Sequence, residues 1–283
     1  MPVLLPPALE LFLDLLRCPT CRTCRLHPDR GTLRCAAGHT FDIARRGYVG
    51  LLTGTRATSG DDAAMVQARD RFLATGRYAP IRQAVARLAA DSAPGPGTVV
   101  DVGCGTGYYL AGVLDQLPGT RGLGLDTSVH ALRSAARSHE RAAAATWDVF
   151  RAFPLADAVA DVVLDVFAPR NPAEFHRVLR PAGRLIVVRP TGLHLAELHD
   201  RVPAMVTIDP AKEQRLHRAM DPYFEAVDTE QVEYLMALDG LEALDLVGMT
   251  PSARHVSWAD LNDDGLLPDR VTVSVLATAY QAR

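Results

Sequence analysis

From about residue 98 onward, short apolar runs typical of buried strands are repeatedly followed by stretches whose apolar residues recur at helical spacing. Strands that alternate with helices are typical of a parallel sheet with helices on both faces. We therefore predict an α/β fold with a doubly wound, Rossmann-like sheet. The predicted strands are 98–102, 121–125, 144–147, 161–167 and 184–188, and the predicted helices are 108–117, 129–138 and 172–179.

Two helices are predicted ahead of this sheet. Asp61 or Asp62 can cap the first, and Gly76 is suited to end it. Pro80 suits the first turn of the second helix, because its missing N–H would have no partner there. A shorter helix is predicted near the N-terminus, where apolar residues at helical spacing occupy positions 9–16.

Changes in composition divide the chain into three predicted parts. Residues 1–52 hold most of the cysteines, residues 53–97 form a linker and two helices, and residues 98–283 hold the sheet. Within the last part, residues 190–268 are more polar, and we interpret them as a substrate-facing insertion. Residues 270–280 alternate apolar and polar positions, as a late antiparallel strand would.

Composition favours a soluble globular protein. The chain has 283 residues, of which 48% are hydrophobic and 22% are charged. No apolar run approaches the roughly 20 residues that a membrane-spanning helix needs. The opening segment lacks the basic start of a secretory signal. We therefore expect a cytoplasmic protein without a membrane partner.

Charge is distributed unevenly along the chain. Residues 1–90 hold 13 arginines against seven acidic residues, a net charge of +6, whereas the remainder carries −9. A basic N-terminal part favours a polyanionic partner. A solvated surface is the alternative, and a GC-rich genome would also produce the preference for arginine over lysine.

A glycine-rich turn follows the first predicted strand and opens a helix. Gly103, Gly105 and Gly107 form G-x-G-x-G, with an acid, Asp101, two residues ahead. A dinucleotide site needs G-x-G-x-x-G, and Tyr108 occupies the position of its third glycine. S-adenosylmethionine has a ribose, an adenine and a cationic amino-acid tail, which Asp101 can orient. The motif therefore favours S-adenosylmethionine as cofactor.

Acidic residues at the next two strand ends strengthen this prediction. The second strand ends at Asp126, 21 residues beyond Gly105, where a carboxylate can accept both ribose hydroxyls. The third strand ends at Asp148, where a side chain meets the adenine edge. Such sheets bind ligands in the crevice at these strand ends.

Four of the five cysteines lie within eighteen residues, with no secretory signal ahead of them. The pattern C-x₂-C-x₁₃-C-x₃-H offers four ligands for tetrahedral zinc. A closed set of four protein ligands leaves no position for a substrate, so we predict a structural site. Cys24 and His27 are spare candidates that we expect to be free surface residues. The predicted ligands are Cys18, Cys21, Cys35 and His39.

With these motifs the chain resembles the RlmA family of ribosomal RNA guanine-N1 methyltransferases, over nearly its whole length. The zinc spacing joined to the run 41–52 is specific, whereas most methyltransferases share the glycine motif. The run 167–172 is most similar to the actinomycete branch that confers macrolide resistance. The matching stretches are 18–21 with 35–39, 41–52, 65–69, 76–80, 101–109, 167–172 and 194–198.

The resemblance implies a methyltransferase domain with a small N-terminal zinc-binding domain that grips an RNA hairpin. It implies methylation at N1 of a guanine in a domain II hairpin loop of 23S rRNA, and macrolide resistance. Residues 252–254 lack the aromatic run that enterobacterial members carry there. The oligomeric state, including a homodimer, stays open. Matching cofactor contacts fall on Tyr78, Thr106, Gly107 and His194.

The reaction needs a group that removes the proton from guanine N1. Asp165, Asn171 and His194 are the candidates, and the sequence does not distinguish them. Two other functions remain: a small-molecule methyltransferase with a structural zinc module, and a non-catalytic zinc RNA-binding protein. The basic N-terminal part argues against the first, and the set of three strand-end acids argues against the second. We expect the methyltransferase core, with its separate sheet, to survive loss of the metal.

Overall fold

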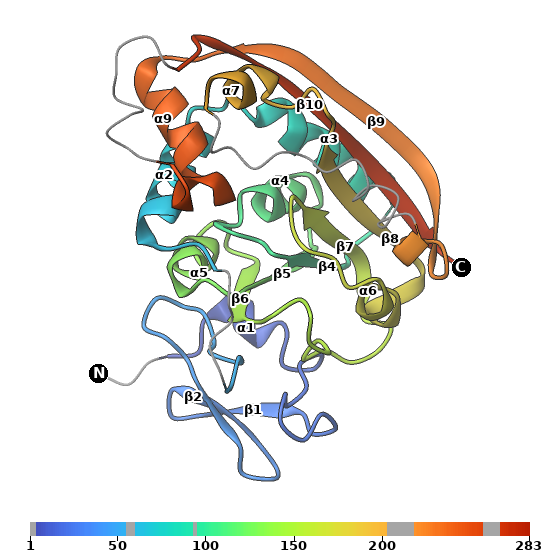
Figure 1. The fold of residues 1–283 in the computed structure, drawn as a ribbon. Helices are drawn as coiled ribbons and strands as arrows, with labels where there is room; N and C mark the ends of the chain where they lie inside the picture. Colours follow the sequence, from blue (N-terminus) through green and yellow to red (C-terminus); the bar gives the residue numbers. More distant parts are fainter. Residues whose placement is uncertain (1–3, 55–59, 93–94, 203–217, 257–266) are drawn as a thin grey trace.

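The structure is a computed structural model that describes residues 4–54, 60–92, 95–202, 218–256 and 267–283. Its main sheet has seven strands. The strands are β4 (Thr98–Val102), β5 (Arg121–Asp126), β6 (Ala142–Thr146), β7 (Ala160–Val166), β8 (Leu179–Pro190), β9 (Phe224–Ala237) and β10 (Arg270–Ala282). Their order is β6-β5-β4-β7-β8-β10-β9 (Figure 1).

The pairing of these strands confirms the predicted doubly wound fold. The five strands from β6 to β8 run parallel, and β4 lies at their centre between β5 and β7. The late strand β10 pairs antiparallel with β8, as its alternating sequence predicted. Among the described helices, none has the length and apolarity to cross a membrane.

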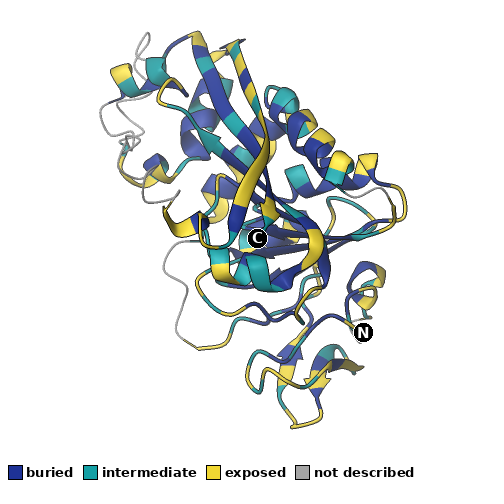
Figure 2. Cartoon of the chain, turned by 90° about the vertical axis from the view of Figure 1, so that its right-hand side faces the viewer, coloured by how far each residue is buried: buried dark blue, intermediate teal, exposed yellow. Residues whose placement is uncertain are grey.

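The interpretation of residues 190–268 as an insertion missed the edge strand of the sheet. Residues 224–237 form β9, which pairs antiparallel with β10 along its whole length. Most of its side chains are exposed because only one neighbour and one face contact it, so its composition resembles that of a loop (Figure 2). The rest of the stretch includes α7 (Ala196–Arg201), α9 (Gly240–Gly248) and a 3₁₀ turn (Pro251–Arg254), while 203–217 and 257–266 lie outside the described residues.

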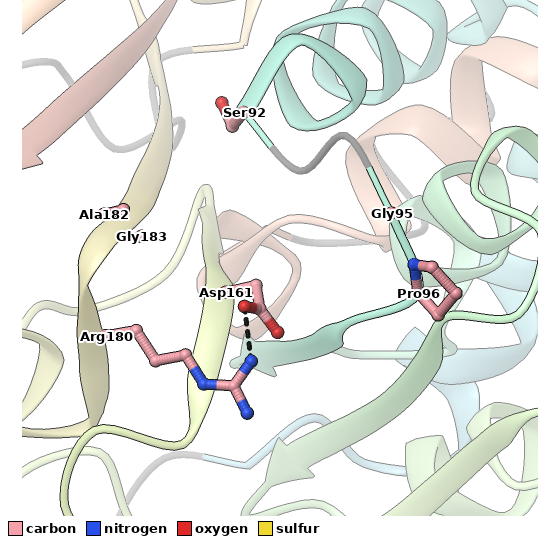
Figure 3. Close-up of a pocket in the computed structure, with 7 residues that line it drawn as sticks. All are labelled: Ser92, Gly95, Pro96, Asp161, Arg180, Ala182 and Gly183. Carbon is pink, nitrogen blue, oxygen red and sulfur yellow. Dashed lines mark hydrogen bonds and ion pairs between the residues drawn. The ribbon is translucent and has the colours of Figure 1, made fainter.

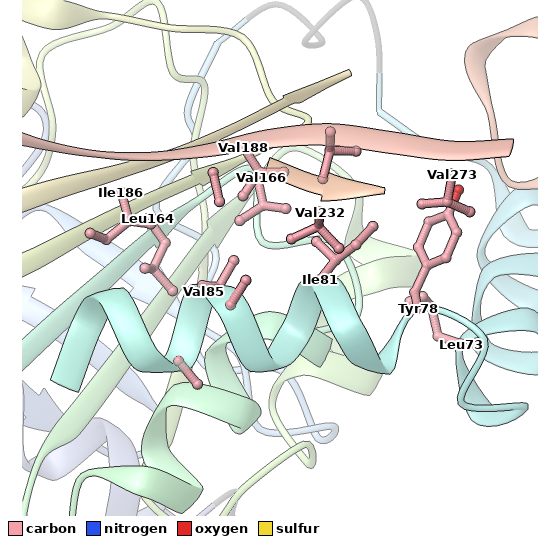
Figure 4. Close-up of a cluster of buried hydrophobic side chains, with 14 of the residues drawn as sticks. Leu73, Tyr78, Ile81, Val85, Leu164, Val166, Ile186, Val188, Val232 and Val273 are labelled. Carbon is pink, nitrogen blue, oxygen red and sulfur yellow. The ribbon is translucent and has the colours of Figure 1, made fainter. Parts of the chain in front are cut away.

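Helices cover one face of the sheet as the periodicity predicted. On α3 (Ala79–Ser92), Ile81 and Val85 point toward apolar side chains of β7 and β8, including Leu164 and Ile186 (Figure 4). The helix α4 (Tyr108–Gln116) packs beside α3. The helix α2 (Ala63–Ala74) is capped by Asp62, whose side chain accepts the N–H groups of Ala64 and Met65. Residues 55–59, in the linker predicted ahead of this helix, lie outside the described residues.

The opposite face is covered in part by the N-terminal segment. Residues 147–159, which connect β6 to β7, form turns without a helix. The segment that begins with α1 (Pro7–Glu10) lies there, and its Leu9, Phe12 and Leu16 are fully buried against the sheet (Figure 1). Its backbone pairs with the turns, since Leu16 forms a β-bridge with Leu155. The N-terminal segment thus occupies the place of a crossover helix.

The cysteine-rich module has its own antiparallel sheet but shares its core with the main sheet. Its strands are β1 (Leu26–Asp29), β2 (Thr32–Cys35) and β3 (Thr40–Asp42), in that order. Leu33 and Phe41 belong to the same buried cluster as Val100 and Leu123 of the main sheet. Val49 also bridges β6, donating its N–H to the carbonyl of Ala144. The two sheets are separate, as expected, but their apolar side chains form one shared core, and the survival of the methyltransferase core without metal stays a prediction.

We predict that Phe12→Ala destabilises the whole chain, by about 3–5 kcal/mol, because it opens a cavity between the N-terminal segment and the main sheet. The measurement is equilibrium unfolding in guanidinium, monitored by far-UV circular dichroism. Leu11→Ala is the matched control, since Leu11 is 44% exposed in the same segment. Equal unfolding free energies for the two variants would contradict the shared core.

Candidate functional site

The glycine loop between β4 and α4 lies at the carboxyl end of the parallel strands. Gly103 adopts a φ of +73°, and a Cβ there would lie 2.6 Å from the Cβ of Ala168. Only glycine fits this position, because any other residue would be strained and would push Ala168 away. The loop after β7, which holds Ala168, is therefore packed directly on the glycine loop.

The first strand-end acid, Asp101, is almost fully buried and incompletely hydrogen-bonded. Its Oδ2 has no hydrogen-bond partner among the described residues. Burial, and then the charges of Asp126 and Asp165, raise the pKa of Asp101 to about 8. A buried acceptor without a donor is costly, so this oxygen fits a cationic group of a bound cofactor.

The second strand-end acid, Asp126, ties the glycine loop to β5. Its Oδ2 accepts the N–H of Gly105 at 2.9 Å, and its Oδ1 accepts the N–H of Ser128 at 2.8 Å. Burial raises the pKa of this carboxyl, and the two backbone donors oppose that rise. Each carboxylate oxygen can accept a further bond, so both stay able to receive ribose hydroxyls.

The third strand-end acid, Asp148, follows β6. Its Oδ1 accepts the N–H of Phe150 at 3.0 Å, which shapes the turn after the strand. The preceding Trp147 donates its backbone N–H to the carbonyl of Asp126 at 2.8 Å, joining the two strand ends. The structure thus brings the three acids to one edge of the sheet, as their spacing predicted.

Two further predicted cofactor contacts lie together at the same edge. Tyr78 Oη and His194 Nε2 are 3.5 Å apart, and both residues are buried. His194 Nδ1 accepts the backbone N–H of Ser274 at 3.2 Å. Burial, and then His199, lower the pKa of His194 to about 4. The imidazole is therefore neutral with its proton on Nε2, and its one basic nitrogen is already occupied. Thr106 lies buried in the glycine loop.

The other two candidates for proton removal differ sharply. Asn171 caps α6 (Pro172–Val178) through a bond from the N–H of Glu174, and its amide donates to the carbonyl of Val149 at 2.8 Å. Asp165 is fully buried, and neither oxygen has a hydrogen-bond partner among the described residues. Arg170 Nε lies 3.5 Å from Asp165 Oδ1, yet burial raises the pKa of this carboxyl to about 8.

Arg69 and Asp61, which the sequence analysis did not assign to the site, close one side of the crevice. Arg69 of α2 donates to Asp61 Oδ2 through Nη2 at 2.6 Å, and to the carbonyl of Met249 at 2.7 Å. Its Cδ would lie 3.7 Å from a Cβ at Gly105. Asp61 in turn accepts the hydroxyl of Ser128 through its carbonyl. Arg69 lies in a stretch similar to the RlmA family, and this was its only signal in the sequence.

The predicted metal ligands converge in the N-terminal module. Cys35 Sγ and Cys18 Sγ lie 3.3 and 3.6 Å from His39 Nδ1, and Cys21 Sγ lies 4.0 Å from Cys35 Sγ. Zinc bonds of about 2.0–2.3 Å in a tetrahedron place ligand atoms about 3.5–3.8 Å apart, so the four fit zinc. Cys24 does not belong to this group of four, and neither does His27.

Two surface cavities lie away from the strand-end crevice. One of about 190 Å³ lies at the opposite edge of the sheet, where Asp161 at the start of β7 pairs with Arg180 at 2.6 Å (Figure 3). The other, of about 570 Å³, lies between the cysteine-rich module and the turns after β6, lined in part by Arg17, Cys18 and Arg177. Neither cavity is lined by the strand-end acids or by the glycine loop.

Comparison with known proteins matches both units of the chain. Residues 16–56 match a family model described as the RlmA N-terminal zinc ribbon, and residues 99–183 match a methyltransferase domain. A Streptomyces fradiae protein named 23S rRNA (guanine(748)-N(1))-methyltransferase is 46% identical over 242 residues, which cover 85% of this chain and 86% of the relative.

Two other relatives carry a similar name provisionally, as 23S rRNA (guanine-N(1)-)-methyltransferases. The protein from Micromonospora griseorubida is 47% identical over 269 residues, which cover 88% of this chain and 90% of the relative. YxjB of Bacillus subtilis is 37% identical over 192 residues, which cover 65% and 67%. The glycine loop with its strand-end acids and the Cys/His cluster agree with these matches, and the chain belongs to the RlmA family of 23S rRNA (guanine-N1)-methyltransferases.

Proposed function

We propose that this chain methylates N1 of a guanine in a domain II hairpin loop of 23S rRNA. The observation that carries the proposal is the match, over 85% of the chain, to a relative named for guanine-N1 methylation. The strand-end acids and the zinc ligands of this chain support it, since both sets are complete. S-adenosylmethionine supplies an activated methyl group on its sulfonium when it is bound.

Within this proposal, each residue of the crevice has a role that its contacts support. Asp101 would orient the cationic tail of the cofactor, because its Oδ2 has no other partner among the described residues. Asp126 would accept the ribose hydroxyls, and Asp148 would face the adenine edge. Tyr78 and His194 would contact the cofactor without exchanging protons, since the basic nitrogen of His194 is occupied. The remaining proposed cofactor contacts are Gly103, Gly105, Thr106 and Gly107.

Of the three candidates for proton removal, we propose Asp165. His194 has no free lone pair, and the amide of Asn171 is not a base. Asp165 retains free acceptor capacity, and a pKa of about 8 suits a base that works near neutral pH. Burial raises the pKa of Asp165 and Arg170 opposes that rise, while the charge of Asp165 in turn raises the pKa of Asp101.

The N-terminal module offers a surface suited to the RNA backbone. Arginines favour planar, bidentate contacts with phosphate, and their summed charge attracts a polyanion. The four predicted zinc ligands lie in the same module as these side chains, so the metal would support RNA binding by stabilising the module, without contacting the RNA. The exposed arginines of the module are Arg22, Arg25, Arg30, Arg34, Arg45 and Arg46.

Three further expectations depend on this activity. Methylation of the domain II loop would confer macrolide resistance on a susceptible host, as in the branch that residues 167–172 resemble. A ribosomal substrate agrees with a cytoplasmic location. A homodimer stays a prediction, which light scattering of the purified protein would decide.

The proposed activity predicts a reverse-transcriptase stop at one guanine of 23S rRNA after incubation with enzyme and cofactor, because N1-methylation blocks base pairing.

Asp126→Ala should raise the cofactor Kd by roughly 30- to 700-fold, which corresponds to a loss of about 2–4 kcal/mol from two charge-assisted bonds. Calorimetry measures this Kd, and Asp115→Ala at the far end of α4 is the control. Methylation of a small metabolite without any stop in the RNA would favour the small-molecule alternative.

The zinc site predicts one bound zinc per chain, lost in Cys21→Ser and retained in Cys24→Ser. Cys21→Ser should lower the affinity for zinc by more than the roughly 10- to 100-fold that is lost when a residue hydrogen-bonded to a metal ligand is removed. Because Cys18 and Cys35 belong to the shared core, Cys21→Ser should also lower the denaturation midpoint of the whole chain and reduce RNA methylation. Metal analysis by mass spectrometry tests the first part, and wild-type protein purified without zinc would contradict the site.

The proposed base predicts that kcat rises with pH, is half-maximal near pH 8 and levels off toward pH 9, because the carboxyl of Asp165 accepts a proton only when ionised. Asp165→Asn should remove this rise and lower kcat by roughly 10²- to 10⁴-fold. Single-turnover rates from pH 6 to 9 measure both effects, with Asp161→Asn at the other end of β7 as control. A variant that keeps the wild-type pH profile would exclude Asp165 as the base.

A further inference from the structure

Phe167 adopts a backbone conformation that a bulky residue rarely takes. It follows the last residue of β7 with a φ of +56°, in the left-handed region. Its N–H donates to the carbonyl of Val188 at 3.2 Å, which holds the chain in this turn. Aromatic residues in this region are outliers, and such strain persists where a site requires it.

The left-handed turn leaves the ring of Phe167 accessible. The residue is 40% exposed, although its neighbour Val166 is buried. Leu193, from the loop after β8, is also an exposed apolar residue, at 57%. The ring of Phe167 therefore combines a strained backbone with an exposed apolar surface.

The ring of Phe167 belongs to an aromatic group drawn from three elements. It stacks on His194 with centroids 5.9 Å apart and planes 21° apart. Tyr109 of α4 lies against it at 6.4 Å and 60°. The neutral imidazole of His194 thus supports the ring, and the exposed part of Phe167 remains available to another planar group.

The position of Phe167 places this ring at the edge of the cofactor crevice. Ala168, the next residue, packs on Gly103 closely enough to exclude a Cβ there. Phe167 is therefore next in the chain to a residue that packs on the glycine loop, and a base must come close to this loop to receive a methyl group. Enzymes that modify a base reach it by extruding it from its stack, and unstacked RNA bases pack on aromatic side chains.

We propose that Phe167 is the stacking platform on which the extruded guanine rests during methylation. This inference rests on the proposed function. Stacking fixes the plane of the base but not its identity, because every base has a π-face. Phe167 stays 40% exposed in the left-handed turn, and a platform role explains why a strained phenylalanine occupies a position suited to glycine or asparagine.

The test compares three variants in RNA methylation with saturating cofactor. Phe167→Leu keeps the apolar bulk and the strain but lacks a π-face, so kcat/KM for RNA should fall roughly 5- to 150-fold. Phe167→Tyr keeps the π-face and should stay within about threefold of wild type. Phe167→Asn, which suits the left-handed region, should lose methylation like Phe167→Leu while its denaturation midpoint stays equal or rises.

A direct readout uses the hairpin RNA with 2-aminopurine in place of the methylated guanine. Wild type should quench the extruded base by stacking, and Phe167→Leu should leave it brighter, with the cofactor Kd of both proteins equal. A weakened cofactor Kd in Phe167→Leu would show that the ring packs on the cofactor and would overturn the platform. Wild-type methylation in the same assay tests the proposed function separately, so unchanged kcat/KM in Phe167→Leu overturns only the platform.

Discussion

The apolar face of the main sheet opposite α3 and α4 must be covered, and this requirement joins the two units of the molecule. The connection from β6 to β7 has no helix, so the buried residues of the N-terminal segment lie there instead. Two of the predicted zinc ligands, Cys18 and Cys35, belong to the same core. Metal binding, the position of the cysteine-rich module and the stability of the sheet therefore all depend on the same apolar core.

The crevice at the other edge depends on a different balance, between burial and charge. Among the described residues, Oδ2 of Asp101 and both oxygens of Asp165 are buried without a hydrogen-bond partner, and burial raises the pKa of each carboxyl to about 8. Asp126 differs, because two backbone N–H groups donate hydrogen bonds to its carboxylate. Burial of these oxygens without donors is unfavourable, and a cationic ligand placed against them would relieve that cost.

Much of the site was predictable because its signals are local in the chain. The spacing of Asp101, Asp126 and Asp148 after three apolar runs placed them at one sheet edge, since the carboxyl ends of parallel strands lie together. The zinc ligands were equally readable from their spacing. The edge strand β9 was not, because an edge strand buries too few side chains to show an apolar alternation.

By itself the sequence determined the alternation of strands and helices, the glycine turn and the grouping of three cysteines with His39, because each depends on residues close together in the chain. The tertiary structure alone decided that the N-terminal segment replaces a crossover helix and that Arg69 closes over Gly105. It also decided that Ser274 occupies the basic nitrogen of His194 and that Phe167 is held in a left-handed turn. These features arise from contacts between residues distant in sequence, whose energies no local pattern records.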